Sequence, residues 1–131
     1  DQQENWNYFY LYALPFRFMN NFNQAIIYNR RALDILLSSK VDKYRDKNLA
    51  NIKLNLGICY QLKEDFSNSI KFLKESIKHN EYRFEAYNSL GLTYSRMDDL
   101  SEANKTYSLG LNKLFDSIYI VDKIPLNIGI R

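Results

Sequence analysis

The sequence predicts an all-α protein of stacked antiparallel helix pairs, and three observations carry this prediction. A self-alignment without gaps relates residues 54–77 to residues 88–111, with a period of 34 residues. Apolar residues in these segments recur at spacings of three and four, as on one face of a helix. The 131 residues include only 4 glycines and 2 prolines, so the connections should be short. We expect a single domain over residues 1–131, with about seven helices.

The first repeat is predicted to cover about residues 6–45. Its first helix begins in the aromatic run "WNYFYLY" (6–12) and contains Pro15, which should kink or shorten it because proline lacks a backbone donor. Its second helix follows Asn21. The first two repeats are 44 residues apart, and the extra residues in "SSKVDKYRDK" (38–47) predict a lengthened second helix and loop.

The second and third repeats, about residues 50–83 and 84–117, resemble each other most. Each has a Leu-Gly pair in its first helix, a tyrosine three residues after the glycine and an aspartate at the turn. These residues are Leu56, Gly57, Tyr60 and Asp65 in one repeat, and Leu90, Gly91, Tyr94 and Asp99 in the other. Residues 118–131 are predicted to be a partial repeat or a cap, because "LNIGI" near the end restates "LNLGI" of the second repeat.

The glycines need an explanation, because glycine inside a helix costs about 0.5–1 kcal/mol relative to alanine. Gly57, Gly91 and Gly129 occupy one repeat position, and Gly110 falls in a partner helix. Two helix axes approach more closely than about 8–10 Å only where a side chain is almost absent. We therefore predict that the glycines mark helix crossings.

The stretch "YNSLGLTYSRMDDLSEANKTYSLGL" (87–111) resembles a tetratricopeptide repeat (TPR), and 34 residues is the repeat length of that family. The resemblance implies a right-handed superhelix of stacked antiparallel helix pairs. It also implies a concave groove, lined by the first helix of each repeat, that binds a peptide or a segment of a partner protein. The longer repeats resemble the TPR domains of bacterial peptide-pheromone receptors.

The helical period places one stripe of each first helix away from the packed side and towards this groove. The stripe consists of Asn7, Tyr10, Leu14 and Arg17 in the first repeat, Asn51, Asn55, Ile58 and Gln61 in the second, Glu85, Asn88, Leu92 and Arg96 in the third, and Asn127 in the last.

Two kinds of side chain in this stripe suit a ligand. The amides of Asn55, Asn88 and Asn127 could pair with the backbone of an extended peptide, since each offers donors and an acceptor. Arg17 and Arg96 could bind a carboxylate through two parallel hydrogen bonds. Simple hydration of exposed side chains is the alternative interpretation for both kinds.

Other functional classes find little support in the sequence. The formal charge is +3 with acidic and basic residues interleaved, and Arg17 alone lies among the N-terminal aromatics, so we expect no nucleic-acid binding. We assign those aromatics to the core, with Tyr10 and Phe18 towards the groove. Cys59 and His79 are the only residues of their kinds. They form no catalytic or metal-binding pattern, so we expect no enzyme activity, cofactor or metal.

The sequence therefore predicts a non-catalytic, cytoplasmic scaffold that binds a protein or an extended peptide, without membrane association. One alternative is a peptide-sensing regulatory domain of a transcription regulator or signalling controller. Another is a repeat module that forms homo-oligomers through its exposed terminal repeat.

Overall fold

The computed structural model describes residues 5–123, with side chains up to residue 118. This part of the chain contains six α-helices and no strand, which confirms the all-α prediction. The helices are α1 (Trp6–Phe18), α2 (Phe22–Ser38), α3 (Arg45–Leu62), α4 (Phe66–His79), α5 (Phe84–Arg96) and α6 (Leu100–Lys123). Gly129, Asn127 and most of the predicted segment 118–131 lie outside the described residues.

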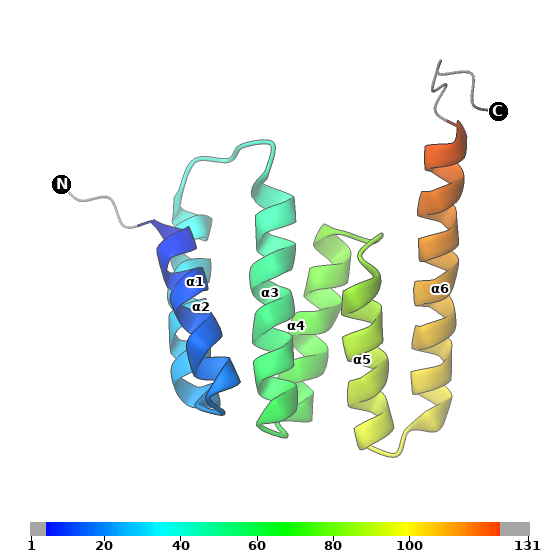
Figure 1. Cartoon of the computed structure of the whole chain (residues 1–131), viewed down its shortest axis with the longest axis horizontal. Coiled ribbons are helices and arrows are strands. Elements are labelled where there is room, and N and C mark those ends of the chain that lie inside the picture. The colour runs from blue at the N-terminus through cyan, green and yellow to red at the C-terminus, as the bar shows by residue number, and fades with distance from the viewer. Residues whose placement is uncertain (1–4, 124–131) are drawn as a thin grey trace.

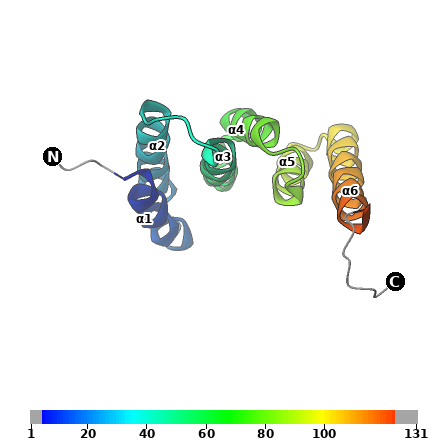
Figure 2. The ribbon, with the colours of Figure 1, turned by 90° about the horizontal axis from the view of Figure 1, so that it is seen from above.

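The helices form three antiparallel pairs that stand side by side in chain order (Figure 1). The pairs are α1 with α2, α3 with α4, and α5 with α6, and they join through contacts of α2 with α3 and of α4 with α5. Helices α1 and α3 stand in front of their partners in Figure 1, and Figure 2 shows α3 and α5 on the same side of α4. The first helices of the three pairs therefore form one layer.

The turn inside each pair repeats the same local chemistry. Asn20, Glu64 and Asp98 adopt left-handed backbone angles (φ 60°, 68° and 61°) and reverse the chain. The next residue in each case is Asn or Asp, and its side chain accepts a hydrogen bond from a backbone N–H of the following helix. The acceptors are Asn21, Asp65 and Asp99, at donor–acceptor distances of 3.3, 3.3 and 3.2 Å.

Pro15 does not shorten α1, contrary to one of the two expected effects. The helix has 13 residues, as many as α5, and it continues to Phe18. A proline at position 15 cannot donate to the carbonyl of Leu11. Since Leu11 and Pro15 are both exposed, water can reach that carbonyl.

The extra residues between the first two repeats lengthen both neighbouring helices. Helix α2 has 17 residues where α4 has 14, and α3 has 18 where α5 has 13. The guanidinium of Arg45 donates to the carbonyls of Leu37 and Ser39, each at 3.2 Å. These bonds tie the start of α3 to the end of α2.

Helix α6 runs past residue 117, where the third repeat was expected to end. Residues 111–123 contain neither glycine nor proline, so nothing in their sequence interrupts the helix. The expected seventh helix has no counterpart among the described residues.

The glycines of the described chain lie where helices cross, as predicted. A Cβ atom added to Gly57 would lie 2.5 Å from Cγ of Leu73 in α4, and one added to Gly91 would lie 2.5 Å from the ring of Tyr107 in α6. Both distances are far shorter than a normal contact. The absent side chain therefore allows each first helix to pack closely on its partner.

We predict that Gly57→Leu destabilises the fold by about 3 kcal/mol or more, because the new side chain must occupy the space of Leu73. Thermal unfolding followed by circular dichroism measures the effect. Lys47→Ala, an exposed change in the same helix, is the control and should be nearly neutral. Equal melting temperatures for the two variants would contradict the close crossing.

Candidate functional site

The outward side of the layer formed by α1, α3 and α5 is the candidate site, which we call the first-helix face. It consists of Asn7, Tyr10, Leu14 and Arg17 from α1, Asn51, Asn55 and Ile58 from α3, and Glu85, Asn88, Leu92 and Arg96 from α5.

The structure places the predicted groove residues in three environments. Asn7, Asn88, Leu92 and Arg96 are exposed, whereas Tyr10, Arg17, Asn51 and Ile58 are half-buried. Asn55 and Gln61 are buried, with 8% and 3% of their surface exposed. Asn127 lies outside the described residues.

Gln61 joins two repeats. Its Nε2 donates to the backbone carbonyl of Ser89 at 2.9 Å and to Oγ1 of Thr93 at 2.8 Å, both in α5. The hydroxyl of Ser69 also lies 3.1 Å from Thr93 and donates to the carbonyl of Gly57 at 2.8 Å. The Gln61 side chain is therefore committed to the joint between the second and third helix pairs, and we leave it out of the first-helix face.

Two arginines connect the first helices across the first-helix face. Nη1 of Arg17 in α1 donates to Oδ1 of Asn55 in α3 at 3.3 Å. Arg83, just before α5, donates to Oδ1 of Asn51 through Nη1 and to Glu85 through Nη2, the latter at 3.0 Å. Arg83 was absent from the predicted site, because it precedes the helix and has no place on the helical period.

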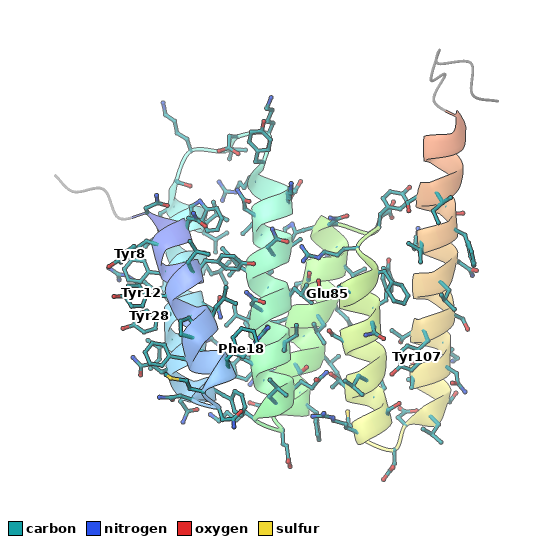
Figure 3. All side chains as sticks on the ribbon, viewed as in Figure 1. Tyr8, Tyr12, Phe18, Tyr28, Glu85 and Tyr107 are labelled. Carbon is teal, nitrogen blue, oxygen red and sulfur yellow. The ribbon has the colours of Figure 1, made fainter. Side chains whose placement is uncertain are left out.

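The first-helix face also carries apolar side chains, and an exposed aromatic ring lies beside Arg17. Leu92 is 37% exposed and Ile58 is half-buried. Phe18, at the end of α1, is 74% exposed, and the guanidinium carbon of Arg17 lies 5.1 Å from its ring centroid (Figure 3). The face thus offers amides, guanidinium groups and apolar contacts together.

The side chains of His79 and Cys59 could in principle take part in chemistry, but their contacts and burial fit a structural role. His79 lies 3.0 Å from a carboxylate oxygen of Asp46 through Nδ1 and 3.2 Å from Nζ of Lys53 through Nε2, which links α4 to α3. Burial raises the pKa of the Cys59 thiol to about 11, so it carries its proton at neutral pH. Within residues 5–123, no cluster of three or more His, Cys, Asp or Glu side chains could hold a metal.

Among the described helices, none combines the length and apolar character that a membrane crossing requires.

We predict that Gln61→Met, which keeps the volume but removes the amide, destabilises the fold by about 1–3 kcal/mol. Stability is lost because the carbonyl of Ser89 and the hydroxyl of Thr93 no longer receive a hydrogen bond from residue 61. The matched control is Gln24→Met, the same change at a half-buried position of α2. Chemical denaturation should separate the two variants, and coincident unfolding curves would show that the joint does not depend on Gln61.

Residues 84–112 match the family model described as a tetratricopeptide repeat. Comparison with curated proteins gave no match.

Solved structures share the fold. The crystal structure of MamA aligns with a TM-score of 0.75 and 18% identity, covering 90% of this chain and 63% of MamA. The chain therefore spans less than two thirds of the length of MamA. The C-terminal TPR-containing domain of a Plasmodium falciparum protein named as FK506-binding aligns with a TM-score of 0.61 and 19% identity, covering 88% of this chain and 91% of that domain.

The resemblance inferred from the repeat pattern is confirmed by these findings. The matched segment 84–112 covers α5 and about the first half of α6, and the stacked pairs have the fold of the two solved structures. One segment of the chain thus matches the tetratricopeptide-repeat model, and the chain as a whole shares the fold of these solved structures.

Proposed function

We propose that the chain is a non-catalytic scaffold that binds an extended segment of another protein, or a peptide, along the first-helix face. The proposal is carried by the row of polar groups that runs across all three first helices. Arg17 connects α1 to Asn55, and Arg83 connects the start of α5 to Asn51. TPR proteins are in general scaffolds for protein–protein interaction, which supports the same conclusion.

The amides of the row are suited to a peptide backbone. In Asn51 and Asn55 the carbonyl oxygen already accepts from an arginine, which leaves the NH₂ group as a donor to a ligand carbonyl. Asn88 is exposed, so its amide can both donate and accept. Backbone pairing of this kind holds an extended segment without selecting its side chains.

The cations add a preference for acidic ligands. Arg96 is exposed at the end of α5, and Arg17 is half-buried at the end of α1. Ile58 in α3, which lies between these two helices, and Leu92 in α5 can contact an apolar side chain of the ligand. We therefore propose that the preferred segment carries a carboxylate close to an apolar residue.

The two alternative roles would each use a particular part of the surface. A peptide-sensing regulatory domain would use the same face, with an effector elsewhere in its protein. Self-association would use the outer side of α1, where Tyr8 and Tyr12 are 57% and 45% exposed (Figure 3). At the same positions of the second repeat, Ile52 and Leu56 are completely buried.

We predict that the double variant Asn88→Ala, Arg96→Ala binds acidic peptides about tenfold more weakly than the unaltered protein, since it loses an amide and a cation. Binding is measured with a diverse peptide library and then by titration of single peptides. Both residues are exposed, so the melting temperature should hardly change.

The matched control is Lys78→Ala, Asn104→Ala, which removes one cation and one amide from exposed positions on α4 and α6. The control should bind like the unaltered protein. Equal binding by both double variants, or no peptide binding at all, would contradict the proposal and favour self-association.

A further inference from the structure

A cavity of about 230 Å³ lies between α4, α5 and α6. Its walls include Leu90 and Tyr94 from α5 and Thr106 from α6, all at least nine-tenths buried. Lys74 and Leu109, which also line it, are exposed. At 100° per residue, Leu90 and Tyr94 are on the opposite side of α5 from Asn88 and Leu92, so the cavity is separate from the first-helix face.

The preceding repeat explains the shape of this cavity. One period earlier, Phe72 occupies the position of Thr106, and Tyr60 occupies the position of Tyr94. The rings of Phe72 and Tyr60 are stacked, with centroids 5.6 Å apart and planes at 3°. Phe72 is 4% exposed, so its ring fills the joint.

A guanidinium group covers this stacked pair. The Cζ atom of Arg30 in α2 lies 5.7 and 5.4 Å from the centroids of Tyr60 and Phe72, and its Nη2 donates to the Tyr60 hydroxyl at 2.6 Å. Lys74 occupies the position of Arg30 in the next repeat, 44 residues later. The joint between the second and third pairs thus keeps the tyrosine and the cation but lacks the phenyl ring.

The space is large enough for the missing ring. An apolar cavity of about 150 Å³ suffices to bind benzene. The Thr106 hydroxyl donates to the carbonyl of Glu102 in its own helix at 2.8 Å, so it needs no partner in the cavity. The remaining walls are the side chains of Ile77, Tyr87 and Glu102, and the Glu102 carboxylate is paired with Lys105 at 3.4 Å.

We propose that this cavity binds one aromatic ring, the phenylalanine side chain of a partner polypeptide, stacked on Tyr94 as Phe72 is stacked on Tyr60. The exposed ammonium group of Lys74 favours a partner with an acidic residue beside that phenylalanine. This site does not depend on the proposed role of the first-helix face.

Short peptides test the proposal on the intact chain. The probe is acetyl-Ala-Phe-Asp-Ala-amide, titrated while the NMR signals of Leu90, Tyr94 and Leu109 are followed. Replacing its phenylalanine by alanine should weaken binding about tenfold, because the buried ring is lost. Replacing its aspartate by asparagine should weaken binding about two- to fivefold, as expected for an exposed ion pair.

Two protein variants locate the ring. Thr106→Phe should fill the cavity, abolish the shifts at Tyr94 and keep or raise the melting temperature. Thr106→Val, the matched control, leaves the space open and should bind the probe like the unaltered protein. Lys74→Gln should remove the preference for aspartate over asparagine.

The proposal can be tested even if Thr106→Phe does not fold, because the phenylalanine and alanine peptides are compared on the unaltered protein. Equal affinity of the phenylalanine and alanine peptides, or no shifts at Leu90 and Tyr94, would overturn the proposal. Binding that persists in a folded Thr106→Phe variant would overturn it as well.

Discussion

Every helix pair of this protein has apolar area on both sides, and stacking on a neighbouring pair is what buries it. Leu56 is completely buried against the first pair, and Leu73 is completely buried in the cluster that joins the second pair to the third. Full burial of one such side chain is worth about 1.5–3 kcal/mol. The glycine crossings serve this arrangement, because they hold the two helices of a pair close enough to present continuous faces to their neighbours.

Stacking also determines what the surfaces can do. It brings the first helices into one layer, where Arg17 and Arg83 reach asparagines of the neighbouring repeat. On the other side of α5 it brings Lys74 and Tyr94 around the space of a missing ring. The proposed partner-binding surfaces therefore arise from contacts between repeats, and no single helix pair contains either one.

The repeat pattern was enough to predict the helix pairs, the turns at Asp65 and Asp99 and the crossing at Gly57, because each depends on local chemistry or on a fixed period. Side-chain direction at the joints was harder to predict. Gln61 fits the outward stripe of α3 by its spacing, but α5 packs close enough to bury its amide. The exchange of Phe72 for Thr106 is visible in the sequence, yet only the packing shows that the neighbours leave its space open.

Hydrogen exchange followed by NMR tests most directly the claim that stacking holds the fold. The account predicts that amides of α3 and α4, which have a helix pair on both sides, exchange most slowly, and that those of α1 and of the last turns of α6 exchange fastest. Equal protection of all six helices, or slower exchange in α1 than in α3, would contradict it.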